Sequence, residues 1–210
     1  ETFSRKNTNA SVAESVERLS AVAAGAGQAK VPVRGYISCV LGCPYEGPVP
    51  VANVTALAQQ LLSMGCAEIS LGDTIGMGTP GAARDMLEQV ARVTGMDRLA
   101  VHFHDTRGQA LANVLACLQA GVRTVDASVA GLGGCPYAAG AAGNLATEDL
   151  VFMLHGLGIE TGIDLPALVR AGHGISRVLG REPGSRLGRL PEYRQTDPDQ
   201  NRPPESVTKT

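Results

Sequence analysis

Short apolar runs alternate along the chain with longer segments whose apolar residues recur at helical spacing. The runs are rich in β-branched residues and predict strands, and the periodic segments predict single helices between them. The expected strands are residues 30–40, 66–71, 99–104 and 122–129. The expected helices are residues 11–26, 50–64, 80–93, 106–120, 145–154 and 164–179. This βα repeat is typical of an α/β fold with a parallel sheet and helices outside it.

The first helix carries the strongest local signal. Ser11 and Glu14 have the spacing of a capping box, so the helix is expected to begin at Ser11. Val12, Val16 and Leu19 then follow at helical spacing. Gly25 and Gly27 are expected to end it.

The last thirty residues differ from the rest. Residues 181–210 contain five prolines among charged and amide side chains. Such a segment cannot bury enough apolar surface to become ordered, so we expect a disordered tail there. The predicted organisation is therefore one α/β portion at residues 1–180 and a tail at 181–210.

Composition excludes two classes of partner and favours one compartment. The net charge of −2, without a basic stripe, argues against nucleic-acid binding. No apolar run reaches the roughly 18–20 residues that span a bilayer, so no membrane segment is expected. The five cysteines are scattered and lack zinc-site spacing. Most of them are expected to be buried in a reducing compartment, the cytoplasm.

The strand at 99–104 ends in the first candidate site. His102 and His104 are two residues apart in an apolar run, so both imidazoles are expected on one face of the strand. Two imidazoles at a strand end form half of a metal site. The alternative is one structural and one incidental histidine.

Polar residues also follow the other strands, where α/β enzymes place their chemistry. Asp73 could bind a ligand or hold the next turn. Cys135 lies between glycines, which suits a reactive thiol better than a core cysteine. Asn144 is either a carbonyl-oxygen ligand or a helix N-cap. His155 and His173 are expected to face solvent or to bind carbonyl groups at helix ends.

Four strings of the sequence closely resemble the hydroxymethylglutaryl-CoA lyase family, over residues 1–190. They are S-C-V-L-G-C-P-Y-E-G (38–47), E-I-S-L-G-D-T-I-G-M-G-T-P (68–80), H-F-H-D-T-R-G-Q-A-L-A-N (102–113) and S-V-A-G-L-G-G-C-P-Y-A-A-G-A-A-G-N-L-A-T-E-D (128–149). The last string, with a cysteine in the glycine loop, is the most specific. H-x-H-D alone also fits related metal-dependent barrels such as isopropylmalate and homocitrate synthases.

The resemblance implies a TIM-type (βα)8 barrel that cleaves 3-hydroxy-3-methylglutaryl-CoA to acetyl-CoA and acetoacetate. It implies a divalent metal, Mg²⁺ or Mn²⁺, and a homodimer for the complete protein. The implied metal ligands are His102, His104 and Asn144. The implied catalytic residues are Cys135, Asp73 and Glu148, the last by supporting the glycine loop. The implied contacts to the acyl-CoA substrate are Lys6, Asn7 and Thr74, with Lys6 and Asn7 placed just after a strand.

The chain departs from the family pattern in length. It holds four βα units where a barrel needs eight, and it lacks the family's Arg-Asp pair and the glutamate of the second strand. We therefore expect this chain to be the C-terminal half to two-thirds of a barrel. Such a piece alone would be poorly folded and inactive. The alternatives are a related Claisen-type lyase or synthase and a non-catalytic, metal-binding remnant.

Overall fold

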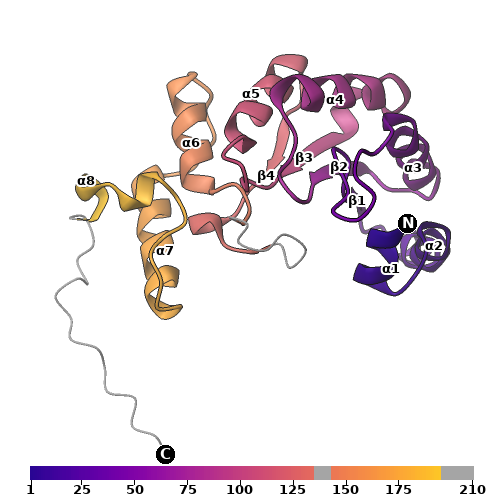
Figure 1. Ribbon diagram of the computed structural model, residues 1–210, viewed down its shortest axis with the longest axis horizontal. Coiled ribbons are helices and arrows are strands. Elements are labelled where there is room, and N and C mark those ends of the chain that lie inside the picture. Colours follow the sequence, from indigo (N-terminus) through magenta and orange to yellow (C-terminus); the bar gives the residue numbers. More distant parts are fainter. Residues whose placement is uncertain (135–142, 195–210) are drawn as a thin grey trace, which may run out of the picture. The chain divides into compact units, whose positions relative to one another are not determined.

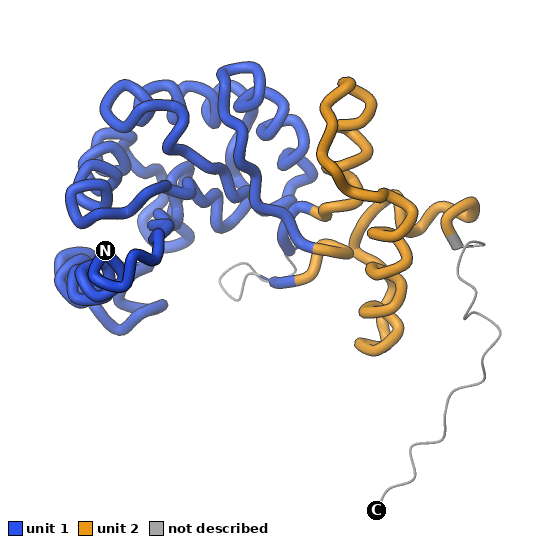
Figure 2. Tube along the Cα trace, turned by 180° about the vertical axis from the view of Figure 1, so that it is seen from behind, with its two compact units in different colours: residues 1–128, 133–145 blue, residues 129–132, 146–210 orange. Residues whose placement is uncertain are grey.

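The computed structural model describes residues 1–134 and 143–194, which form two compact units (Figure 2). Unit 1 comprises residues 1–128 and 133–145, and unit 2 comprises residues 129–132 and 146–210. In unit 1 the helices are α1 (Thr2–Thr8), α2 (Val12–Gln28), α3 (Val51–Ser63), α4 (Pro80–Thr94), η1 (Met96–Arg98) and α5 (Ala110–Ala120). Its strands are β1 (Arg34–Ile37), β2 (Glu68–Asp73), β3 (Leu99–Phe103) and β4 (Thr124–Asp126).

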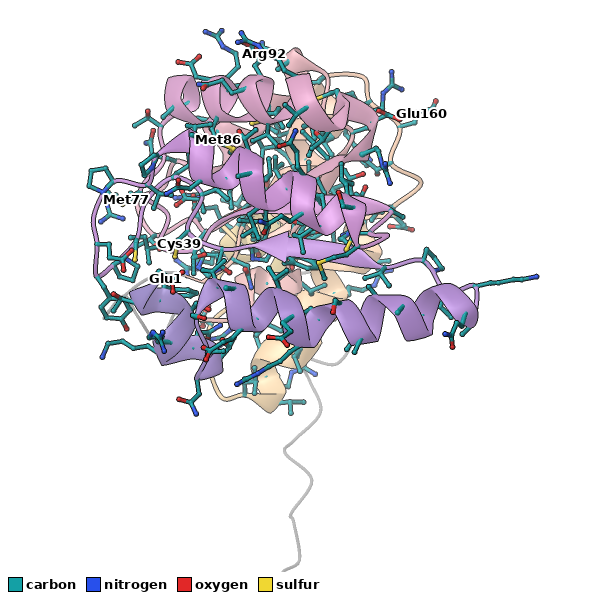
Figure 3. All side chains as sticks on the ribbon, turned by 90° about the vertical axis from the view of Figure 1, so that its right-hand side faces the viewer. Glu1, Cys39, Met77, Met86, Arg92 and Glu160 are labelled. Carbon is teal, nitrogen blue, oxygen red and sulfur yellow. The ribbon has the colours of Figure 1, made fainter. Side chains whose placement is uncertain are left out.

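The four strands form one parallel sheet in the order β1-β2-β3-β4. Helices α3, α4 and α5 cover one face of it (Figure 1). That face is apolar and buried, with Ile69, Leu71 and Val101 fully enclosed. Met86 of α4 lies within this packed layer, whereas Arg92 projects away from it (Figure 3). The expected βα rhythm is confirmed for all four strands.

The opposite face of the sheet is polar. Side chains alternate between faces along a strand, so the register places Arg34, Ser70, His102 and Asp126 together on this side. In β1 exposed and buried residues alternate: Arg34 and Tyr36 are exposed, and Gly35 and Ile37 are buried. The sheet therefore has an apolar face for packing and a polar face for chemistry.

Two helices precede β1, and one of them was not predicted. The capping box at Ser11 is confirmed: Glu14 N–H donates to Ser11 Oγ at 3.1 Å, and Ser11 N–H donates to Glu14 Oε2 at 2.6 Å. The expected end at Gly25 and Gly27 is wrong, because α2 continues through both glycines to Gln28. Helix α1 was missed because its sequence buries no residue and gives no apolar period.

The expected helix at 106–120 begins later than predicted. Asp105 Oδ1 accepts the N–H of Ala110 at 3.0 Å, and Gly108 has a positive φ of 66°. Residues 105–109 therefore form a turn, and α5 begins at Ala110. Among the described residues, no helix combines the length and apolar character needed to cross a membrane.

Unit 2 contains η2 (Val129–Gly131), α6 (Thr147–Gly156), α7 (Leu165–Val178), η3 (Leu187–Arg189) and α8 (Pro191–Arg194). Helix α7 begins as predicted, with Asp164 Oδ1 accepting the N–H of Ala167 at 2.9 Å. The expected contact of His173 with a carbonyl is also present, since its Nε2 lies 2.7 Å from the oxygen of Gly188.

The prediction of a disordered tail from residue 181 is wrong for its first part. Asp149 of α6 accepts the N–H groups of Arg186 and Leu187, each at 2.9 Å. Gly184 N–H donates to the oxygen of Ala130 at 2.9 Å, and Ser185 is fully buried. Backbone hydrogen bonds, which composition does not reveal, therefore fix residues 184–188; residues 195–210 lie outside the described part.

Candidate metal centre

Strand β3 presents the two histidines together. His102 is paired with Gly72 and Asp126 on the polar face, and Phe103 is buried on the other face. His104 follows one residue after the strand, and its ring centroid lies 5.5 Å from that of His102, with the planes tilted by 51°. The predicted juxtaposition of the two imidazoles is confirmed.

Backbone pairing brings Asn144 beside His104. The two residues form an isolated antiparallel bridge, flanked by Asp105 N–H to Gly143 oxygen at 3.2 Å and Leu145 N–H to Phe103 oxygen at 3.3 Å. Gly133 is needed here, because a Cβ at this position would lie 2.5 Å from Asn144 Nδ2. The N-cap of α6 is Ala146, so the N-cap interpretation of Asn144 is wrong.

The chemistry of these three side chains fits a divalent cation. His104 is 9% exposed, and burial, with a smaller effect of His102, lowers its pKa. A neutral imidazole is the form that binds a metal. Among the described residues no group of three His, Cys, Asp or Glu side chains could hold a metal. The side chains of His102, His104 and Asn144 offer two imidazoles and one amide oxygen, and such a set would leave positions open for further ligands.

The polar face also carries a charged network that the sequence did not reveal. Arg34 donates to Asp126 Oδ1 at 2.9 Å and pairs with Glu68, and Ser70 Oγ donates to Asp126 Oδ2 at 2.9 Å. The available signal was the presence of polar residues at alternate positions of β1 and β2. It becomes interpretable only once the register of four strands is known.

Asp73 is on the other face of the sheet from His102. It pairs with Phe103, is fully buried, and uses both carboxylate oxygens within its own turn. Oδ1 accepts the N–H of Met77 at 3.1 Å and Oδ2 that of Gly78 at 2.8 Å. Burial raises the pKa of Asp73, against the lowering effect of these N–H groups. The structure does not bring this carboxylate to the imidazole pair, and its geometry is that of a residue that holds a turn.

Thr74 also acts on the backbone, because its Oγ1 accepts the N–H of Cys39 at 2.9 Å. Cys39 has a positive φ of 61°, so this bond fixes an unusual conformation directly after β1. The hydroxyl of Thr74 keeps its own proton for donation to a further group.

In unit 2, Glu148 holds the short η2 segment. Both of its carboxylate oxygens lie within hydrogen-bond distance of Ala130 N–H, at 2.8 and 3.0 Å. Ala130 has a positive φ of 54°, and a Cβ on Gly172 would lie 2.3 Å from Glu148 Oε1. Burial raises the pKa of Glu148. The carboxylate therefore fixes the segment just before the glycine loop.

Lys6 and Asn7 lie in α1, so their expected position after a strand is wrong. Asn7 lines a cavity of about 430 Å³, together with Tyr36 of β1 and Cys39. Lys6 Nζ lies 5.2 Å from the centre of the Tyr45 ring. Glu1, which together with Cys39 is labelled in Figure 3, lines the same cavity.

Four cysteines, Cys39, Cys43, Cys66 and Cys117, are buried thiols, as expected. The candidate nucleophile or acid Cys135 lies outside the described residues. Its predicted role therefore stays a prediction.

A family model described as HMGL-like matches residues 1–175. The chain belongs to the HMGL-like family. The hydroxymethylglutaryl-CoA lyase of Gallus gallus is 58% identical over 187 residues, which cover 89% of this chain and 63% of that protein. The HMGL-like chain thus spans less than two-thirds of this relative.

Solved structures agree with the family assignment. The hydroxymethylglutaryl-CoA lyase of Pseudomonas aeruginosa superposes with a TM-score of 0.87 at 56% identity, covering 90% of this chain and 63% of that one. A lyase from Acinetobacter baumannii, solved with coenzyme A and 3-methylmalate, has a TM-score of 0.84 at 35% identity over 96% of this chain and 64% of its own. The predicted fold class, an α/β portion of a TIM-type barrel, is confirmed.

The expectation of a cytoplasmic location is wrong as a general inference for this HMGL-like chain. The relatives from Gallus gallus, Mus musculus and Arabidopsis thaliana are named mitochondrial. The relative from Danio rerio, 57% identical over 187 residues, is named cytoplasmic. Buried cysteines do not distinguish between these compartments.

Proposed function

We propose that the protein containing this chain cleaves 3-hydroxy-3-methylglutaryl-CoA to acetyl-CoA and acetoacetate. The observation that carries the proposal is 57–59% identity along 186–187 residues with relatives that are all named as lyases of this substrate. The adjacency of His102, His104 and Asn144 supports a metal-assisted reaction.

The reaction needs two proton transfers around one bond cleavage. The tertiary hydroxyl of the substrate loses its proton, and its oxygen becomes the ketone of acetoacetate. The carbon–carbon bond breaks, and its electron pair stays on the acetyl-CoA fragment as an enolate. That carbon then takes a proton, so the sum of atoms and charges is conserved. We assign this last proton to the thiol of Cys135, because a thiol can approach a neutral pKa.

The proposed metal ligands are His102, His104 and Asn144, with Mg²⁺ or Mn²⁺ as the ion. A bound divalent cation lowers the pKa of a hydroxyl and neutralises a carboxylate on the same substrate. The chain itself contributes a neutral imidazole at His104, whose pKa is lowered by burial and, to a smaller extent, by the neighbouring His102.

Three of the other implied residues receive positioning roles. Asp73 holds the turn after β2, Thr74 holds the backbone of Cys39 after β1, and Glu148 holds η2 before the glycine loop. Lys6 and Asn7 are proposed to contact the CoA part of the substrate. The complete protein is further proposed to be a homodimer, which sedimentation would test.

The test uses the natural gene product that carries these 210 residues. Incubated with the substrate and Mg²⁺, it is expected to release acetyl-CoA and acetoacetate in equal amounts. Cys135→Ala is expected to lower kcat by about 100-fold or more, as for loss of a general acid. Cys66→Ala, which removes a buried thiol next to β2, is the matched control and should retain turnover. Unchanged cleavage by Cys135→Ala would refute the role of this thiol, and absence of both products with the wild type would refute the lyase assignment.

A further inference from the structure

Asp126 ends β4 directly beside His102, its partner in the parallel ladder. Its Oδ2 lies 3.5 Å from Nδ1 of His102. This ring nitrogen is buried and has no hydrogen-bond partner among the described residues, and the charged carboxylate of Asp126 lies next to it. We infer that Asp126 is a positioning residue that keeps the proton of His102 on Nδ1 and so presents Nε2 as the ligating atom. This inference rests on the proposed metal site.

The carboxylate of Asp126 is itself held from two other strands. Arg34 of β1 donates to Oδ1 and Ser70 of β2 donates to Oδ2, both at 2.9 Å. Arg34 reaches along the polar face from β1 to β4, past the two strands between them. Two donors from other strands fix the orientation of the carboxylate, and Oδ2, which keeps a second lone pair, is the oxygen that lies 3.5 Å from His102 Nδ1.

The ring of His102 has two aromatic neighbours. Tyr36 packs against it in a T-shaped arrangement, with centroids 6.3 Å apart and planes at 83°, and His104 lies on another side. Edge-to-face packing restricts rotation of the imidazole. The neighbouring rings restrict the orientation of the imidazole, and Asp126 determines which of its two nitrogens carries the proton. In metal sites a histidine ligand commonly donates its second N–H to a carboxylate, which fixes the tautomer.

Glu68 provides the matched comparison. It is a carboxylate on the same face of the sheet and pairs with the same Arg34, but it is the first residue of β2, whereas His102 pairs with Gly72 further along that strand. If the network only stabilised the sheet, Asp126→Asn and Glu68→Gln would behave alike. If Asp126 positions His102, only Asp126→Asn should affect the imidazole.

The structure predicts that Asp126→Asn changes the tautomer of His102. Arg34 is an obligate donor, so the amide oxygen must face it. The amide NH2 then takes the position near Ser70 and His102. Because that group donates, His102 Nδ1 must accept, and the proton moves to Nε2. The ligating nitrogen is then protonated and cannot bind a cation.

The first test needs no metal. Nitrogen-15 spectra of the imidazoles report the tautomer, and the chain has four histidines, so loss of signals in His102→Gln assigns the ring. At pH 8, the wild type and Glu68→Gln are expected to show His102 with Nδ1–H. Asp126→Asn is expected to show Nε2–H. A wild-type ring protonated on Nε2 would overturn the inference without any variant.

The second test titrates Mn²⁺ by calorimetry. Asp126→Asn is expected to weaken binding about 10–100-fold, the usual effect of removing such a carboxylate, while Glu68→Gln stays within about twofold. Equal losses in both variants would overturn the inference. Should Asp126→Asn fail to fold by circular dichroism, Ser70→Ala replaces it, with about a threefold loss expected from one hydrogen bond. Absence of Mn²⁺ binding by the wild type would refute the metal site instead, and the tautomer would still decide the role of Asp126.

Discussion

In each unit a glutamate side chain accepts a backbone N–H from a distant segment: Glu46 in unit 1 and Glu148 in unit 2. The pKa values of these two carboxyl groups are shifted in opposite directions. Glu46 is exposed, and the hydroxyl and N–H of Thr2 lower its pKa to about 2. Glu148 is buried, and desolvation raises its pKa. A lowered pKa adds stability above the unfolded value of 4.5 that is lost as the pH falls. A raised pKa has the reverse effect, because ionisation then costs free energy in the folded state.

For Glu46 we expect the attachment of α1 to weaken as the pH falls from about 4.5 towards 2, the interval between its unfolded and folded pKa. Carbon-13 titration of the side-chain carboxyl group should give a midpoint near the lower value. In Thr2→Val the hydroxyl is lost while the N–H remains, so the midpoint should rise. A wild-type midpoint near 4.5 would contradict the observed contact.

Among elements, α2 depends on its first turn. Ser11→Ala removes the side-chain acceptor of Glu14 N–H, and we expect a loss of about 1 kcal/mol in the free energy of unfolding, as for other N-cap serines. Urea titration followed by circular dichroism measures it. Ser20→Ala, in the exposed middle of the same helix, is the control and should change stability by less than about 0.5 kcal/mol. Equal losses would show that the cap contributes nothing specific.

The elements differ in how much of them the sequence could predict. The four strands were found because apolar, β-branched runs report burial between helices directly. Helix α1 was missed because its anchor is a contact 44 residues away, between Thr2 and Glu46. Glycines near a helix end predict termination, but α2 continues through Gly25 and Gly27. A Cβ at either position would contact no other atom, so no close approach requires glycine there.

At the scale of the whole molecule, the candidate site was half predictable. The spacing of His102 and His104 determines their shared face, so that part followed from the sequence. Placing Asn144 beside them requires an antiparallel bridge across a loop, and placing Asp126 requires the register of β3 and β4. Neither pairing leaves a periodic signal in the sequence. The same limit applies to the tail, whose order comes from backbone groups.

The end of the chain gives the last prediction. Deleting residues 183–210 removes the N–H groups of Arg186 and Leu187 from the buried carboxylate of Asp149, and the oxygen of Gly188 from His173. Two hydrogen bonds to a charged group contribute about 3 kcal/mol together, so amides of α6 should exchange about 100-fold faster. Deleting residues 195–210 leaves all of these contacts and should not change the exchange. Equal acceleration by both deletions would show that residues 183–194 do not stabilise α6, and that the contacts of Asp149 are not what holds this segment in place.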